Sequence, residues 1–305
     1  MPRNKIKLII NPNADLGRAW RVAADLRPLV DQFGGADWTG TVYPTHATEL
    51  ASQAGEEGYE LIIAAGGDGT AHEVINGLMQ LPAERRPRFG IVPLGTGNDF
   101  AHAVGVQSPA EVALRQVFSG QPKRIDIGVL RDNLGRTEYW DNTVGIGFDA
   151  TATIHSRKYA YMRGFIVYFL AVLQTILLNH DAPNLQIESD FENWTEDTLM
   201  MVLCNGPREG GGFHVAPEAK VDDGVLHYAS VCRVSRPMML RLLPEVMKGT
   251  HGRFSQVRMG QFHRMQINSD RPLTIHTDGE IYAGFGVNVH QVSLEILPEA
   301  LEVMV

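Results

Sequence analysis

Residues 61–79 read LIIAAGGDGTAHEVINGLM, and this stretch decides the fold of the N-terminal part of the chain. The run Leu61–Ala65 is apolar throughout, as in a strand that is buried on both faces of a parallel sheet. Gly66–Thr70 interrupts the strand, and from Ala71 onward apolar residues recur at helical spacing. The stretch therefore predicts a buried strand, a glycine-rich loop and a helix, which together form the repeating unit of an α/β domain.

Short apolar runs alternate with longer amphipathic segments on both sides of this unit, up to about residue 120. Such alternation predicts parallel strands that are joined by helices. Strands are predicted at Lys7–Ile10, at a short run that Tyr43 closes and at Phe89–Val92, and helices over Ala19–Phe33 and His46–Gly58.

Beyond about Pro122 the pattern changes to short alternating runs that turns separate, which indicates antiparallel strands packed as a sandwich. The apolar segment Phe165–Leu178 is shorter than the ~20 residues that a helix needs to span a bilayer, so a buried helix is expected there. We therefore predict an α/β domain over residues 1–122 and a mostly antiparallel β-sandwich domain over residues 123–305. The C-terminal end of the chain could pack back on the first domain.

The composition excludes several classes of protein. The 305 residues carry 27 Lys and Arg against 35 Asp and Glu, and the net charge of -8 argues against a basic face that binds nucleic acid. The two cysteines, Cys204 and Cys232, are too few for a disulfide scaffold and lack the spacing of a zinc or redox pair. The first residues show no apolar core of a signal peptide. We expect a protein of the reducing cytosol.

Two glycine-rich loops follow predicted strands, at the sheet edge where ligands of parallel α/β sheets bind. In Gly66–Thr70, the glycines let the backbone approach a phosphate, and the following helix offers free N–H groups at its N-terminus. Asp68 would repel a bare phosphate but suits one that carries Mg²⁺. Gly95–Asp99 repeats these features after another strand, and the loop Asn11–Gly17 ends at the same edge. Singly, each loop could be an ordinary turn, but together they predict a site for a nucleotide and a metal ion.

These motifs resemble those of the diacylglycerol kinase catalytic-domain family, which includes sphingosine and ceramide kinases, and most closely its small bacterial soluble members. The resemblance covers nearly the whole chain, and the second glycine loop separates it from the related NAD kinases. It implies an ATP-binding α/β domain of NAD-kinase and diacylglycerol-kinase type, followed by a β-sandwich domain for the lipid substrate. It is carried by Asn11-Pro12, Thr45, Gly66–Thr70 with Glu73–Gly77, Pro93–Phe100, Gly210–Gly212 with Pro217, Asp222–Gly224 and Asp278–Glu280.

The resemblance also implies roles for individual residues of the first domain. Asp68 and Asp99 are expected to form an acidic network near a Mg²⁺ ion that accompanies ATP. The expected nucleotide contacts are Asn11, Pro12, Asn13, Thr45, Gly66, Gly67, Asp68, Gly69, Thr70, Glu73, Gly95, Thr96 and Asn98.

In the second domain, the resemblance places the general base in the turn Asp278–Glu280. Asp278 is the first choice, and Glu280 is a metal-linked partner or the alternative base. Without the resemblance, Asp278 and Gly279 would be interpreted as the turn of a β-hairpin. The eleven histidines show no spacing of metal ligands and receive no catalytic role. A second, structural Mg²⁺ is expected at the Asp223 side chain and the backbone carbonyls of Lys220 and Val225.

The sequence and the resemblance together predict an ATP- and Mg²⁺-dependent lipid kinase. Carboxylates for a metal ion and glycine loops for phosphates are what phosphoryl transfer requires. The leading reaction is the conversion of diacylglycerol to phosphatidic acid, a step of phospholipid biosynthesis. A soluble-metabolite kinase resembling NAD kinase and a catalytically idle nucleotide- or lipid-binding protein stay open as alternatives. The sequence also leaves a homodimer open.

An apolar acceptor must be reached at the bilayer, so we expect transient docking of a cytoplasmic protein on the inner membrane surface. Arg157, Lys158 and Arg163 stand among aromatic residues and are candidates for contact with anionic lipid. A solvated helix start is the simpler interpretation of the same residues. The segment Phe165–Leu178 is expected to line an apolar pocket in the second domain.

Overall fold

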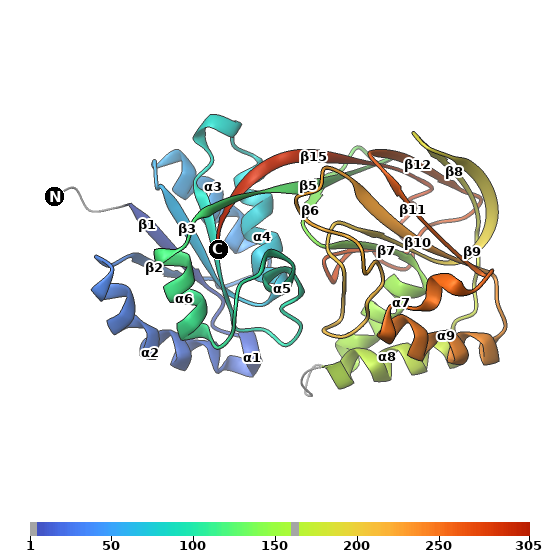
Figure 1. The fold of residues 1–305 in the computed structure, drawn as a ribbon, viewed down its shortest axis with the longest axis horizontal. Coiled ribbons are helices and arrows are strands. Elements are labelled where there is room, and N and C mark those ends of the chain that lie inside the picture. Colours follow the sequence, from blue (N-terminus) through green and yellow to red (C-terminus); the bar gives the residue numbers. More distant parts are fainter. Residues whose placement is uncertain (1–4, 160–164) are drawn as a thin grey trace. The chain divides into compact units, whose positions relative to one another are not determined.

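A computed structural model describes residues 5–159 and 165–305 of the chain. The chain divides into two units: unit 1 comprises Met1–Asp126 and Glu299–Val305, and unit 2 comprises Ile127–Pro298. The chain leaves unit 1 within β5 (Pro122–Asp132) and returns to it within β15 (Gln291–Met304) (Figure 1). Arg163, one of the residues proposed for contact with lipid, lies outside the described residues.

The centre of unit 1 is a parallel sheet in the order β4, β3, β1, β2. In its register Ile9 pairs with Ala64, and Ala64 pairs with Ile91. All three side chains are excluded from water, which explains why these strands are apolar runs in the sequence. The strands are β1 (Ile6–Ile10), β2 (Asp37–Gly40), β3 (Leu61–Gly66) and β4 (Arg88–Pro93).

Helices cover both faces of this sheet (Figure 1). On one face, α2 and α6 share a core with β1, β3 and β4, and Phe33 stacks on Phe118 with 4.7 Å between ring centroids. On the other face α3 and α4 pack closely, since a Cβ on Gly77 would lie 2.8 Å from the Cβ of Ala51. The helical segments of unit 1 are α1 (Ala14–Gly17), α2 (Ala19–Gln32), α3 (His46–Glu56), α4 (Asp68–Met79), η1 (Ala83–Arg85), α5 (Asp99–Val104) and α6 (Ala110–Ser119).

Two helix or strand boundaries in unit 1 differ by three residues from those predicted, and the others differ by at most two. Helix α4 begins at Asp68 rather than near Ala71, because Gly67 has an extended backbone and serves as the N-cap. Strand β2 ends at Gly40 rather than at Tyr43, because its partner β1 ends at Ile10 and offers no further ladder. The second half of the Gly66–Thr70 motif is therefore the first turn of a helix, where backbone N–H groups are free of helical partners.

Unit 2 is a mostly antiparallel β-sandwich, as the sequence predicts. One layer contains β8, β12, β15, β5 and β6, and the other contains β7, β9, β10, β11, β13 and β14. Strand β9 takes part in both layers: it pairs first with β8 and then with β7 and β10. The remaining strands are β6 (Thr137–Trp140), β7 (Thr143–Gly147), β8 (Asn184–Ser189), β9 (Asn193–Cys204), β10 (Leu226–Cys232), β11 (Val257–Phe262), β12 (Arg264–Ser269), β13 (Ile275–Thr277) and β14 (Glu280–Ala283).

The second half of β9 is buried on both faces. Met201 and Leu203 belong to the core that the sandwich strands share, whereas Val202 and Cys204 belong to a second core on the opposite face. Helices α7, α8 and α9 cover that opposite face. The helical segments of unit 2 are α7 (Phe148–Ser156), η2 (Arg157–Tyr159), α8 (Phe165–Leu178), α9 (Arg236–Lys248) and η3 (His251–Arg253).

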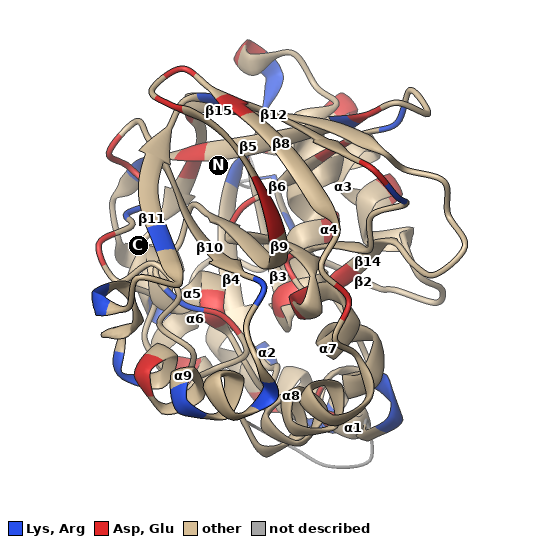
Figure 2. Cartoon of the chain, turned by 90° about the vertical axis from the view of Figure 1, so that its right-hand side faces the viewer, with Lys and Arg blue, Asp and Glu red and all other residues tan. Residues whose placement is uncertain are grey.

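Helix α8 is the most apolar helix of unit 2. None of its 14 residues is Lys, Arg, Asp or Glu, so it is tan along its length in Figure 2. Ile166, Leu177 and Leu178 at its two ends are exposed, whereas Val172 and Ile176 are buried against unit 2. Among the described residues, no helix combines the length and the apolar character that a membrane span requires.

Candidate active site

The two glycine loops of unit 1 touch each other. A Cβ on Gly67 would lie 3.1 Å from the Cα of Gly95, so both positions need a residue without a side chain. The Gly95 N–H donates to Asn98 Oδ1 at 3.0 Å, and Asn98 Nδ2 donates to the Gly95 carbonyl at 2.9 Å. Asn98 itself has a φ of 51°, and Thr96 at the tip of this loop is exposed. The glycine and asparagine positions thus build one compact backbone surface.

Asp68 and Asp99 lie beside this surface, on either side of Gly97. A Cβ on Gly97 would lie 2.9 Å from Asp68 Oδ2 and 3.2 Å from Asp99 Oδ2. Burial and the neighbouring charge of Asp99 raise the pKa of Asp68 to about 7, although hydrogen bonds from backbone N–H groups, including that of Phe100 at 3.1 Å, oppose the shift. Two carboxylates that repel each other fit a divalent cation, because the cation offsets the repulsion.

The first loop of the chain joins the same edge of the sheet. The Asn11 N–H donates to the Ala65 carbonyl at the end of β3, and Asn11 Nδ2 donates to Thr70 Oγ1 at 3.3 Å. Asn11 Oδ1 accepts the N–H of Asn13 at 3.0 Å. Pro12 is half-buried between them. The structure therefore brings Asn11–Asn13 next to the first glycine loop.

Glu73 connects Thr45 to α4. Its carboxylate accepts the backbone N–H groups of Thr45 at 2.9 Å and Ala47 at 3.0 Å, and so it fixes the start of α3. Thr45 is exposed and has a φ of 72°. The structure thus gives Glu73 a part in positioning Thr45, while the nucleotide contacts of both residues stay predictions. Gly69 lies in the first turn of α4.

The turn proposed for the second metal ion precedes β10. Asp223 Oδ1 accepts the N–H of Val225 at 3.3 Å, and Asp223 Oδ2 lies 3.7 Å from Nε2 of His227. Lys220 and Asp223 are exposed. Carboxylate and carbonyl oxygens are suitable ligands for Mg²⁺, so this turn fits the ion, and its occupation stays a prediction.

The predicted catalytic turn is a two-residue β-hairpin between β13 and β14. Asp278 and Gly279 have φ values of 49° and 84°, as a type I′ turn requires at both central positions. Local turn geometry therefore explains the Asp-Gly pair, as the interpretation without the resemblance proposed. It does not explain where the carboxylate of Asp278 points.

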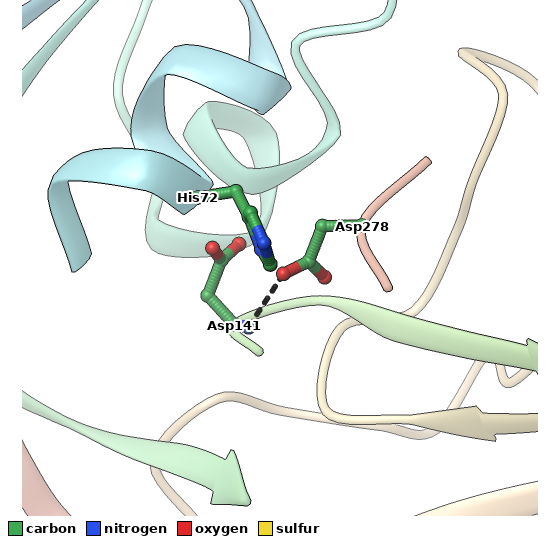
Figure 3. A group of neighbouring side chains, drawn as sticks. All are labelled: His72, Asp141 and Asp278. Carbon is green, nitrogen blue, oxygen red and sulfur yellow. Dashed lines mark hydrogen bonds between the residues drawn. The ribbon is translucent and has the colours of Figure 1, made fainter. Parts of the chain in front are cut away.

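That carboxylate is buried and faces the segment before β7. Asp278 Oδ1 accepts the N–H groups of Asn142 and Thr143 at 2.9 Å, and Oδ2 accepts the N–H of Asp141 at 3.0 Å, the bond drawn in Figure 3. The Asp278 N–H in turn donates to the Thr143 carbonyl at 2.8 Å. Three of these bonds fix the position of the carboxylate and the fourth fixes the backbone of Asp278, which is more than a hairpin turn needs.

Glu280 occupies a different environment. It is exposed, and its Oε2 lies 3.2 Å from Nη2 of Arg157 at the end of α7. The two carboxylates of the turn are therefore distinct: one is buried on backbone donors, and one is solvated beside a guanidinium. Arg157, which the sequence analysis proposed for lipid contact, is engaged by the predicted catalytic turn.

An apolar pocket of about 80 Å³ lies in the helix-covered core of unit 2. Tyr168, Val172 and Ile176 of α8 line it, as expected for the segment Phe165–Leu178. The rest of this mostly apolar wall comes from α7, α9, η3, strands β9, β10 and β11, and the loop between β9 and β10. The other lining residues are Phe148, Asp149, Leu199, Met200, Glu209, Phe213, Val215, Val231, Val234, Met239, Leu242, Leu243, Val246, His251 and Val257.

One wall of this pocket carries a buried polar group. Asp149 accepts hydrogen bonds from Tyr168 Oη and from His276, with 2.6 Å between Asp149 Oδ2 and His276 Nε2. Burial alone would raise the pKa of Asp149, but the adjacent His276 and hydrogen bonds from His276, Glu209 and Tyr168 lower it. Asp149, Glu209 and His276 offer ligand atoms within 4.8 Å of one another. Sequence reasoning missed this group because its members are far apart in the chain and lie in no motif.

Two glycines of the Gly210–Gly212 motif pack against aromatic side chains of α8. A Cβ on Gly210 would lie 2.7 Å from the ring of Tyr168, and one on Gly212 would lie 2.7 Å from the ring of Phe165. Gly210 also has a φ of 58°. The motif therefore lets a loop pass directly against the aromatic rings of α8.

Comparison with known families and proteins agrees with this arrangement. Residues 5–130 match the diacylglycerol kinase catalytic domain, and residues 142–305 match the YegS C-terminal NAD kinase beta sandwich-like domain. A probable YegS-like lipid kinase of Chromohalobacter salexigens is 31% identical over 233 residues, which cover 76% of this chain and 73% of that protein. A diacylglycerol kinase of Bacillus subtilis is 27% identical over 304 residues, 97% of each chain.

A solved structure supports the fold. The crystal structure of a diacylglycerol kinase from Bacillus anthracis superposes with a TM-score of 0.70 at 22% identity, and it covers 100% of this chain and 97% of that chain. At this identity the likeness extends to the fold alone. It confirms the predicted order of an α/β domain followed by a β-sandwich domain.

Proposed function

The chain belongs to the diacylglycerol kinase family of lipid kinases, and from this premise we propose that it transfers the γ-phosphoryl group of ATP to a hydroxyl of a membrane lipid. The product would be a phosphorylated lipid and ADP. Diacylglycerol is the leading acceptor and phosphatidic acid the leading product, which would place the enzyme in phospholipid biosynthesis. The similarity to the diacylglycerol kinase of Bacillus subtilis supports this choice.

The apolar pocket of unit 2 is the observation that carries the proposal. The cavity is lined by α8, α9, β9 and β10, and its wall is mostly hydrocarbon. A polar, soluble metabolite would gain little by binding in such a cavity. An acyl chain would bind there favourably, because the transfer of each methylene from water contributes roughly 0.8 kcal/mol to the free energy of binding. The pocket favours a lipid acceptor over the alternative of a soluble-metabolite kinase.

Unit 1 supplies the nucleotide side of the proposal. The joined glycine loops and the N-terminus of α4 present backbone N–H groups suited to phosphate oxygens. Asp68 and Asp99 would hold the Mg²⁺ ion, which would neutralise charge on the phosphates. Burial and the charge of Asp99 raise the pKa of Asp68 to about 7, so a bound cation would favour the ionised form of both carboxylates.

The Asp278–Glu280 turn supplies the candidates for the general base. A base accepts the proton of the lipid hydroxyl as the phosphoryl group moves. Asp278 is held in a fixed position by three backbone donors, as a positioned base requires, while Glu280 is solvated beside Arg157. We keep Asp278 as the first choice and Glu280 as the alternative or the metal-linked partner.

The exposed ends of α8 are the proposed contact with the membrane. Leu177 and Leu178 are 69% and 64% exposed on the helix whose buried face lines the pocket. Exposed leucines that insert at the interface, with basic residues nearby for anionic headgroups, are the usual composition of a peripheral contact. Lys158 is exposed and stays a candidate for the basic component, whereas Arg157 is paired with Glu280.

Transfer of label from ATP tests the proposed function. Purified protein is incubated with labelled ATP, Mg²⁺ and mixed vesicles that contain diacylglycerol, and the label is partitioned between organic and aqueous phases. Label in the organic phase is expected. Label only in a water-soluble product would favour the metabolite kinase, and no label in any product would favour an idle binding protein.

Two substitutions on α9 test whether the pocket holds the acceptor. Val246 lines the pocket, whereas Leu240 on the same helix is exposed. Val246→Trp should raise the KM for the lipid and leave the KM for ATP unchanged, because the indole fills the cavity. Leu240→Trp should leave both unchanged. Equal lipid KM values in the two variants would contradict the assignment of the pocket.

A further inference from the structure

The inner end of the pocket and the Asp278–Glu280 turn are joined by one side chain, His276. Its Nε2 lies 2.6 Å from Asp149 Oδ2 on the pocket wall, and its Nδ1 accepts the backbone N–H of Gly279 at 3.3 Å. Asp149 and His276 are both buried. A single imidazole therefore bridges a carboxylate on α7 and the second residue of the turn.

The partners of His276 assign its tautomer. Because the Gly279 N–H points at Nδ1, this nitrogen acts as the acceptor, and the ring proton is on Nε2, where it is donated to Asp149. A proton on Nδ1 would face the Gly279 N–H. Asp149 thus stabilises the tautomer of His276 whose Nδ1 can accept the Gly279 N–H. Tyr168 Oη in turn donates a hydrogen bond to the other carboxylate oxygen of Asp149.

The contact between Asp149 and His276 depends on a glycine in the neighbouring strand. Gly145 of β7 lies directly against Asp149 Oδ2 and His276 Nε2, so a Cβ at this position would collide with both atoms. Strand β13 brings His276 opposite Gly145 in the sheet register. The glycine thus makes the space in which the carboxylate and the imidazole meet.

We propose that His276 is a positioning residue for phosphoryl transfer: oriented by Asp149, it holds the Gly279 N–H and thereby sets the backbone of the turn that carries Asp278 and Glu280. This inference rests on the proposed function, because it assumes that the turn supplies the base. It gives a role to a histidine that no motif of the sequence contains. It also links the pocket wall to the turn through two hydrogen bonds.

Two substitutions each preserve one half of the bridge. In His276→Asn, the Oδ1 atom takes the place of Nδ1 and accepts the Gly279 N–H, but the shorter side chain does not reach Asp149. In His276→Gln, the terminal amide takes the place of Nε2 and donates to Asp149, but Gly279 loses its acceptor. His155→Asn is the matched control, since His155 is a buried histidine of the same unit whose Nδ1 bonds to Thr175 Oγ1.

The expected result is a split between kcat and KM. His276→Gln should lower kcat by about tenfold, the loss that one hydrogen bond accounts for, with the KM for ATP unchanged. His276→Asn should lose less of kcat, and His155→Asn should keep it once values are normalised to folded protein. Wild-type kcat in His276→Gln, or equal losses in all three variants, would overturn the proposal.

Amide hydrogen exchange supplies a readout that needs no activity. Exchange at Gly279 should be faster in His276→Gln than in wild type, and it should stay slow in His276→Asn and in His155→Asn. Unchanged exchange in His276→Gln would overturn the proposal even if kcat falls. Absence of lipid labelling by the wild-type protein would defeat the proposed function instead, and the exchange result would still decide whether His276 holds the turn.

Discussion

The ionisation of Asp68 depends on its burial and on the neighbouring Asp99. Its pKa is about 7 in the folded chain against an ordinary value of 3.8, because of burial and the charge of Asp99. Between these two values the folded chain binds one more proton than the unfolded chain. The contribution of protonated Asp68 to stability is therefore fully present below about pH 4 and is lost as the pH rises through about 7, by at most about 1.4 kcal/mol per pH unit.

We predict that the free energy of unfolding falls over this range in the absence of divalent cations. Urea unfolding between pH 4.5 and 8 measures it, and Asp68→Asn is the control, since an amide does not titrate. When Mg²⁺ and ATP are added, the free energy of unfolding of the wild-type protein should depend less on pH, because a cation favours the ionised form of both carboxylates. A difference that is independent of pH would contradict the raised pKa.

Asp278 and Glu280 should respond differently to the loss of their charge. Asp278→Asn replaces one acceptor oxygen by an NH₂ group that faces backbone N–H donors, so we predict a loss of about 1–3 kcal/mol in the free energy of unfolding as well as a lower kcat. Glu280→Gln affects an exposed ion pair, and its effect on stability should stay below about 0.5 kcal/mol.

Single-turnover rates per folded molecule separate the two candidates for the base. General-base assistance is typically worth about 10²–10⁴-fold, so the residue that supplies it should show a loss in that range with ATP affinity intact. If Asp278→Asn and Glu280→Gln both keep near wild-type rates, the turn is a structural hairpin and not the source of the base.

At the scale of the element, α8 has a buried side and an exposed side, and we propose a different function for each. Its buried side lines the pocket, and its exposed Leu177 and Leu178 have no apolar cover in the described structure. We predict that Leu177→Glu with Leu178→Glu weakens binding to anionic vesicles by at least about tenfold, because burial of one leucine is worth roughly 1.5–3 kcal/mol. Sedimentation with vesicles measures the change.

The control for this prediction is Phe191→Glu, which places one negative charge, against two in the double variant, at another exposed apolar residue of unit 2, in the turn between β8 and β9. It should bind vesicles as wild type does. Lys158→Ala should make binding less dependent on salt. Vesicle binding that survives the double leucine substitution but not Phe191→Glu would move the contact to the turn between β8 and β9.

Elements with a strong local signal could be predicted from the sequence. The apolar run Leu61–Ala65 and the glycine loop after it indicate a buried parallel strand and a phosphate site, because each needs only neighbouring residues. Boundaries were less certain for physical reasons. The end of β2 depends on where its partner β1 stops, and the start of α4 depends on the backbone angles of Gly67.

The polar group on the pocket wall could not be predicted in this way. Asp149, Glu209 and His276 come from α7, a loop and β13, and the pairing of β13 with β7 brings His276 close to α7, which follows β7. Likewise, nothing local indicates that Asp278 caps three N–H groups more than 130 positions earlier in the chain. Long-range contacts of single side chains leave no periodic trace in one sequence.

At the scale of the whole molecule, β15 is, with β5, one of two strands that run through both units. Its first part pairs with β12 in unit 2, and its last residues belong to unit 1, where Val303 pairs with Phe89 of β4. Unit 1 is thus completed by the last residues of the chain. The final residue exchanges backbone hydrogen bonds with Gln121 at 2.9 and 3.1 Å. Unit 1 is therefore discontinuous in sequence, and its sheet can be complete only when the end of the chain is in place.

Substitution of two valines near opposite ends of β15 tests whether each unit can be destabilised without the other. Val292 and Val303 are both fully buried, the first in unit 2 and the second in unit 1. Replacement of either by Ala should cost roughly 2 kcal/mol through lost burial and a small cavity. We predict that Val303→Ala speeds amide exchange in β3 and β4 and weakens ATP binding, while β8 and β12 keep their protection. Val292→Ala should show the reverse pattern, because each cavity opens in a different core. If each variant accelerates exchange in both units equally, the chain unfolds as one cooperative body and the division into two energetic units is wrong.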